Sequence, residues 1–83
     1  MIYDIVFSES ALGQLKKLDY HAQDRILASL ERIRTDPEHY VRKLVDDPGY
    51  RLRVGDYRVI LDIEKSKLLI LVIKIGHRRN IYE

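Results

Sequence analysis

Apolar and polar residues alternate with two different periods along the chain, and the change of period predicts the secondary structure. Residues 2–7, IYDIVF, are β-branched and aromatic with apolar side chains on one face, which predicts a strand. Two stripes at helical spacing follow, joined by the short segment LDYHA, and together they predict an antiparallel helical hairpin. The stripes consist of Ala11, Leu12, Leu15 and Leu18, and then of Ala22, Ile26, Leu30 and Ile33.

The ends of these helices have recognisable signals. Ser8 is suited to cap the first helix, because its hydroxyl can accept a bond from an exposed backbone N–H. Asp36-Pro37 ends the second helix, since the residue before a proline disfavours the helical conformation. Residues 36–49 contain two Asp-Pro pairs and are predicted to form an irregular connector. Its apolar anchors are Tyr40, Val41, Leu44 and Val45.

Three further strands are predicted after the connector, at residues 50–54, 57–64 and 67–75. Gly55-Asp56 joins the first two, and a turn near Lys65-Ser66 joins the last two, which predicts a β-meander. Residues 68–73, LLILVI, are apolar on both faces and therefore belong inside the sheet. The predicted order β-α-α-β-β-β is an α+β fold, with the N-terminal strand and helical hairpin packed on one face of a small, mainly antiparallel sheet. We expect residues 1–83 to form a single domain.

The predicted hairpin places arginines against each other. With Gly55 and Asp56 as the turn residues, Arg53 lies opposite Arg58, and alternation puts Arg51 on the same face, away from the core. Like charges directly across a strand pair repel by a few tenths of a kcal/mol. These arginines are either ordinary solvated residues or a cluster that binds an anion, and the planar guanidinium matches a phosphate well.

The C-terminal segment KIGHRRNIYE extends this basic surface. Gly76 ends the last strand, and His77, Arg78 and Tyr82 follow where they could reach the arginine face. Histidine is the side chain that titrates near neutrality, although His77 could equally make a hydrogen bond at the strand end. Tyr82 is a candidate core anchor, base-stacking platform or proton-transfer group.

Composition narrows the possible functions. Residues 1–49 carry seven Lys/Arg against nine Asp/Glu and residues 50–83 carry eight against four, so net charges of −2 and +4 favour a polyanionic partner for the C-terminal part. The chain has no cysteine, and no apolar run approaches the roughly 18 residues of a membrane span. No metal is expected, because His21 and His39 lack partners at ligand spacing. No other cofactor is expected either. We expect a cytoplasmic protein without membrane contact.

With these features assembled, the chain resembles small toxins of the RelE/ParE superfamily, the toxic halves of type II toxin–antitoxin pairs. The resemblance rests on the strand and two helices, on Lys43-Leu44, on the hairpin YRLRVGDYRVI and on the ending GHRRNIY. The ending favours the RelE branch over the ParE relatives that poison DNA gyrase. The alternatives are a ParE-like gyrase inhibitor without nuclease activity and a non-toxic RNA-binding homologue.

The resemblance implies a metal-independent endoribonuclease that cuts mRNA in the ribosomal A site by attack of the 2′-hydroxyl on the adjacent phosphate. It implies three partners: a RelB-like antitoxin, which could form a heterotetramer with the toxin, the mRNA, and the ribosome with its 16S rRNA. Carried over by position, the family's functional residues fall on Arg51, Arg53, Arg58, Arg78 and Tyr82. Because arginine does not deprotonate in proteins, proton transfer is left to Tyr82, to His77 or to neither.

Overall fold

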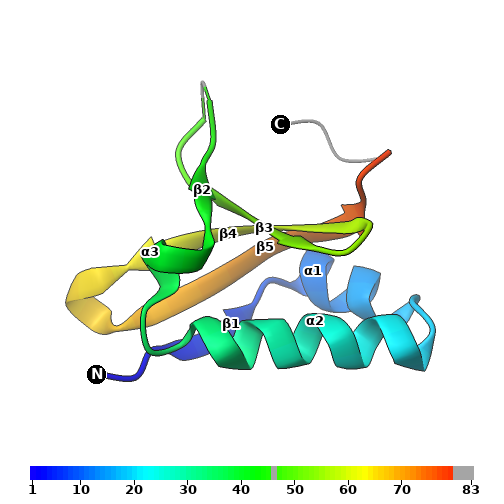
Figure 1. Cartoon of the computed structure of the whole chain (residues 1–83), viewed down its shortest axis with the longest axis horizontal. Coiled ribbons are helices and arrows are strands. Elements are labelled where there is room, and N and C mark those ends of the chain that lie inside the picture. The colour runs from blue at the N-terminus through cyan, green and yellow to red at the C-terminus, as the bar shows by residue number, and fades with distance from the viewer. Residues whose placement is uncertain (46, 80–83) are drawn as a thin grey trace.

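A computed structural model describes residues 1–45 and 47–79. It confirms an α+β fold with a pair of helices on one face of the sheet (Figure 1). The strands run in the order β1-β5-β4-β3-β2, with β1 parallel to β5 and the other neighbours antiparallel. The elements are β1 (Asp4–Phe7), α1 (Glu9–Lys16), α2 (Tyr20–Ile33), α3 (Pro37–Tyr40), β2 (Arg42–Lys43), β3 (Tyr50–Val54), β4 (Tyr57–Glu64), the 3-10 turn η1 (Lys65–Lys67) and β5 (Leu69–His77).

Helices α1 and α2 begin at side-chain caps and bury the predicted stripes. The Ser8 hydroxyl accepts a bond of 3.0 Å from the N–H of Ala11, and the Asp19 carboxylate accepts one of 2.8 Å from the N–H of Ala22. Both stripes face the sheet, except that Leu12 remains 39% exposed. None of the described helices is long and apolar enough to cross a membrane. The core consists of Ala11, Leu15, Ile26, Leu30, Ile33, Leu52, Val54, Val59, Leu61, Ile70, Val72 and Ile75.

The connector between the helices and the hairpin is more ordered than predicted. It contains the four-residue helix α3, which begins at Pro37, and the two-residue strand β2. The N–H of Leu44 donates to the carbonyl of Gly49 at 3.1 Å, which turns the chain back toward β3. The sheet therefore has five strands where the sequence predicted four. Elements of two and four residues are too short to leave a periodic pattern.

The register of the β3–β4 hairpin is confirmed. Val54 pairs with Tyr57, Arg53 with Arg58, and Arg51 with Ile60. Gly55 has a φ of +58°, and no positive φ occurs at Asp56, as in the type II′ turn with glycine at its first central position. The turn thus determines which side chains share the face away from the helices.

A β-bulge in β5 changes which of its residues face the helices. Ile60 pairs with Lys74 but Leu61 pairs with Val72, so Ile73 is an extra residue in β5. The backbone groups around the bulge find partners on the helical side: the Ser8 hydroxyl donates to the carbonyl of Ile73 at 2.9 Å, and the side-chain oxygen of Gln14 accepts from the N–H of Ile75 at 2.7 Å. Residues after the bulge consequently alternate in the opposite sense from those before it.

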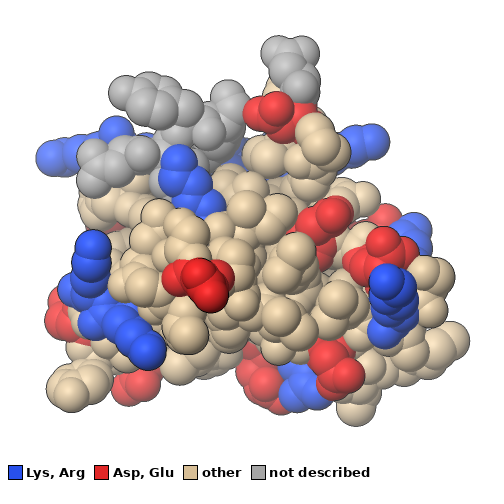
Figure 2. Space-filling view, turned by 180° about the vertical axis from the view of Figure 1, so that it is seen from behind, with Lys and Arg blue, Asp and Glu red and all other residues tan. Residues whose placement is uncertain are grey.

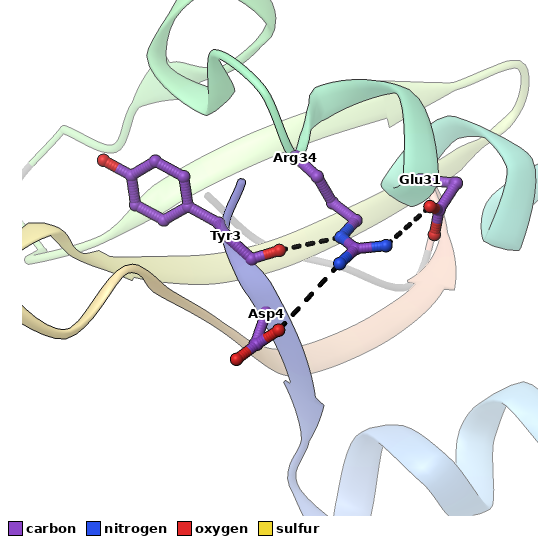
Figure 3. Close-up of polar contacts among 4 residues, drawn as sticks. All are labelled: Tyr3, Asp4, Glu31 and Arg34. Atoms are coloured by element: carbon purple, nitrogen blue, oxygen red, sulfur yellow. Dashed lines mark hydrogen bonds and ion pairs between the residues drawn. The ribbon is translucent and has the colours of Figure 1, made fainter. Parts of the chain in front are cut away.

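Arg34 fastens the edge strand β1 to the end of α2 (Figure 3). Its Nε donates to the carbonyl of Tyr3 at 2.7 Å, and its Nη1 donates to Glu31 Oε1 at 2.6 Å. Its Nη2 lies 3.9 Å from Asp4 Oδ1, and the N–H of Tyr3 donates back to the carbonyl of Arg34 at 2.9 Å. One guanidinium therefore joins the start of β1 to the end of α2, through two residues that are thirty-one positions apart in the sequence.

We expect Arg34→Ala to lower the free energy of unfolding by about 1–3 kcal/mol, because it removes charge-assisted hydrogen bonds from a partly buried group. Urea unfolding followed by circular dichroism measures the change. Lys67→Ala is a suitable control, since it removes an exposed cation from η1. Equal stability of the two variants would contradict this role of Arg34.

Candidate active site

A cavity of about 270 Å³ opens on the face of the sheet away from α1 and α2. One short helix and three strands contribute to it: α3, β2, β3 and β4. Within the part of the chain that the structure describes, no carboxylate lines it. The lining residues are Tyr40, Arg42, Arg51, Arg53 and Arg58. The structure therefore brings together the three arginines that the sequence predicted on the hairpin.

In this cavity, arginines on neighbouring strands face each other in two pairs. Arg53 lies across from Arg58, and Arg51 lies across from Arg42 on the other side of β3. The pKa of Arg58 is lowered from its usual value, first by partial burial and then by the charges of Arg53, Arg51 and Arg78, while Asp56 acts in the opposite direction. The cavity is thus a region of concentrated positive charge that an anion would neutralise.

Arg78 is held beside this cluster by the hairpin turn. Its backbone N–H donates to the carbonyl of Asp56 at 2.8 Å, and its Nε lies 4.0 Å from Asp56 Oδ1. Where β4 pairs with β5, Gly76 lies opposite Arg58. Glycine has no side chain, so β5 does not cover the Arg58 guanidinium at this position. The effect of Arg78 on the pKa of Arg58 shows that the two guanidiniums share one electrostatic environment.

His77 lies on the other side of the sheet from the arginines. It pairs with Tyr57, which packs against the core, and the two rings meet edge to face with their centroids 5.7 Å apart. Its Nδ1 accepts a bond of 3.3 Å from the N–H of Arg79, which is the strand-end role considered as the alternative. Tyr82, the other predicted proton-transfer residue, lies outside the described residues.

Tyr40 and Arg42 also line the cavity, and the sequence pattern did not indicate either as a site residue. Tyr40 is predicted as an apolar anchor, yet its side chain is 45% exposed at the cavity. Arg42 falls in the predicted irregular connector, and only its place in β2 brings it to the cavity. The neighbouring basic pair Arg42-Lys43, shortly before the predicted hairpin, was the available signal.

The fold and site define an α+β protein that presents a cluster of arginines from one face of its sheet. Residues 5–82 match the family described as ParE toxin of type II toxin-antitoxin system, parDE. The chain belongs to this family, within the RelE/ParE superfamily, and is therefore a toxin of the toxin–antitoxin class. Among curated proteins, no sequence matches the chain.

Solved structures support the same assignment. A chain of the intact Escherichia coli RelBE toxin–antitoxin complex is 28% identical, with a TM-score of 0.76 and coverage of 90% of this chain and 95% of that one. The Mycobacterium tuberculosis RelBE2 complex gives a TM-score of 0.85 at 20% identity, covering 94% and 100%. The archaeal RelE–RelB complex of Pyrococcus horikoshii gives 0.77 at 24%, covering 98% and 100%. The last two establish the similarity of fold.

We expect Arg53→Gln to raise the melting temperature by about 1–5 °C, because it removes direct cross-strand repulsion from Arg58. Inorganic phosphate, compared with chloride at equal ionic strength, should stabilise the wild type more than this variant. Differential scanning fluorimetry measures both effects. Lys67→Gln removes one charge away from the cavity and should show neither; the same shifts in that variant would refute a local origin.

Proposed function

We propose that this toxin is a RelE-type, ribosome-dependent endonuclease that cuts mRNA in the A site and so inhibits translation. The observation that carries the proposal is the cavity in which four arginines from three strands converge. Its ligand would be the scissile phosphodiester of the mRNA. Such a toxin acts where ribosomes translate, which corresponds to a cytoplasmic location.

The arginines would act on the charge that develops at phosphorus. In the proposed reaction the 2′-hydroxyl oxygen forms a bond to the adjacent phosphorus, the bond to the 5′-oxygen breaks, and the products are a 2′,3′-cyclic phosphate and a 5′-hydroxyl. The pentavalent intermediate carries additional negative charge, and guanidiniums placed in advance stabilise it without reorganisation. Arg51, Arg53 and Arg58 would also hold the phosphate in line for the attack.

The proton from the 2′-hydroxyl requires a separate acceptor, because arginine cannot serve as a base. The position of His77 against Tyr57 does not favour it for this role. We assign the acceptance of this proton to the phenolic oxygen of Tyr82, and without it to solvent. The same oxygen, or solvent, gives up a proton to the departing 5′-oxygen, which completes the 5′-hydroxyl. The arginines provide positioning and charge stabilisation. His77→Gln should then retain cleavage, whereas Tyr82→Phe should slow it.

A RelB-like antitoxin is the proposed resting partner, and a toxin–antitoxin heterotetramer is the proposed assembly. The similar chains from E. coli, M. tuberculosis and P. horikoshii come from toxin–antitoxin complexes. This chain has a suitable surface for a protein partner: Figure 2 shows a broad area with few charged side chains across one side, interrupted by an acidic side chain and bordered by further charged ones. Exposed apolar residues on the helices and connector, Leu12, Leu27 and Val45, are the proposed docking points.

A ParE-like inhibitor of DNA gyrase is the second candidate. The observation in its favour is the description of the matching family, which names ParE. The two functions predict damage to different nucleic acids. The nuclease cleaves mRNA, whereas gyrase poisoning produces DNA breaks and inhibits supercoiling and leaves transcripts intact.

Mapping of RNA ends after induction tests the first function directly. We expect new ends within codons of translated transcripts, and little cleavage of free RNA. Arg58→Ala and Arg78→Ala should each reduce the cleavage rate roughly 10²–10³-fold, by analogy with the loss of one donor to a developing oxyanion. Lys67→Ala, on the distant η1 turn, should retain toxicity. Intact transcripts during growth arrest would overturn the nuclease, and DNA breaks would then identify the gyrase inhibitor.

A further inference from the structure

A second cationic cavity lies between α2 and the β3–β4 turn. Its volume is about 350 Å³, and within the described part of the chain no acidic side chain lines it. The lining residues are Arg25, Ala28, Ser29, Arg32, Arg53, Val54 and Gly55. Neither the proposed chemistry nor the family assignment gives this cavity a role.

The cavity follows from the spacing of residues on α2. Arg25, Ser29 and Arg32 lie at positions i, i+4 and i+7, beside the buried stripe that packs on the sheet. The small side chains of Ala28 and Ser29 leave room between the two guanidiniums, and the serine hydroxyl adds a hydrogen-bond donor.

One of these guanidiniums lies against the β3–β4 turn. The terminal nitrogens of Arg25 lie 2.8 and 2.9 Å from the point where a Cβ on Gly55 would be. The positive φ favours glycine at this position, and the absence of a Cβ leaves room for the flexible end of Arg25. The contact places a cation from α2 directly against the hairpin that carries the active-site arginines.

The charges around this cavity are not neutralised by neighbouring carboxylates. Among the described residues, no ion pair joins an acid to Arg25, Arg32 or Arg53. Glu31, the acid next to Arg32 in the sequence, bonds to Arg34 instead. Arg25 and Arg32, with Arg53 also a lining residue, give this cavity an excess of positive charge that favours a polyanion over packing as the reason for the cluster.

Arg53 connects the two cavities, because it is a lining residue of both. A chain of phosphates passing over the edge of β3 would meet Arg58 and Arg53 first, and then Arg25 and Arg32. A single-stranded polyanion with regularly spaced charges matches such a path, whereas an isolated small anion would occupy one cavity alone.

We propose that the α2 cavity binds a backbone phosphate of RNA, next to the phosphate that occupies the active site. This inference rests on the proposed ribonuclease function. The phosphate belongs either to the mRNA strand that flanks the cleaved bond or to ribosomal RNA, and the chemistry of recognition is the same for both. Arg25 and Arg32 are accordingly binding residues that do not touch the reacting atoms.

Equilibrium binding at several salt concentrations tests the inference without requiring cleavage. The probes are a short single-stranded RNA and purified small ribosomal subunits without mRNA, each added to the antitoxin-free full chain. Removing one arginine–phosphate interaction reduces the slope of log K against log salt concentration by about 0.7 for single-stranded RNA. We expect Arg25→Gln/Arg32→Gln to show at least one such reduction, and Arg25→Lys/Arg32→Lys to retain most of the slope.

The matched control is Lys16→Gln/Lys17→Gln, which removes two exposed cations near the end of α1. A reduced slope with the short RNA supports an mRNA phosphate, and a reduced slope with subunits alone supports a ribosomal RNA phosphate. An unchanged slope in both arms, an equal change in the lysine control, or no binding by the wild type to either RNA would overturn the inference. Thermal melting verifies that each variant folds.

Failure of the α2 phosphate site and failure of the proposed nuclease give different experimental outcomes. If the wild type leaves transcripts intact in cells, the nuclease is refuted, yet a reduced slope in the double variant still identifies a phosphate-binding site. If transcripts are cleaved and the slope is unchanged, the nuclease stands and the α2 cavity has no role in binding RNA.

Discussion

The extra residue at Ile73 determines what each side of β5 presents to the rest of the molecule. Before the bulge, Ile70 and Val72 enter the core, and after it Ile75 does so. Strict alternation from Ile70 would instead direct Lys74 and Gly76 toward the helices. The bulge removes that conflict and places Gly76 opposite Arg58, where a larger side chain would occupy the space over the guanidinium. Ser8 and Gln14 satisfy the backbone groups that the irregularity displaces.

The arginines that line the sheet cavity oppose the stability of the sheet that carries them. Cross-strand repulsion between Arg53 and Arg58 destabilises the hairpin, and the pKa of Arg58 is lowered first by partial burial and then by the neighbouring arginines. The fold compensates elsewhere, through a single apolar core, side-chain caps on α1 and α2, and the Arg34 clamp on β1. The same strands thus carry the charge cluster on one face and contribute to the apolar core on the other.

Much of this architecture could be predicted from the sequence, because long elements leave periodic patterns. The helical stripes, the capping role of Ser8 and the pairing of Arg53 with Arg58 all followed from spacing and from the glycine turn. Elements that depend on tertiary contacts could not be predicted. The strand β2 exists only because Arg42 and Lys43 pair with β3. The position of His77 could not be predicted either. The extra residue at the bulge in β5 reverses the alternation of side chains after it, so the His77 ring contacts Tyr57 and does not lie on the arginine face.

The short length of β2 has a consequence for association between copies of this protein. It pairs only with Tyr50 and Arg51, so among the described strands none covers the outer edge of β3 from Leu52 to Val54. An uncovered edge is a template for strand addition by another chain. Arg53 and the nearby Arg25 surround this edge with positive charge, which repels an identical edge while remaining compatible with an anionic ligand. The same side chains that would hold RNA would therefore also oppose the pairing of this edge with that of a second copy.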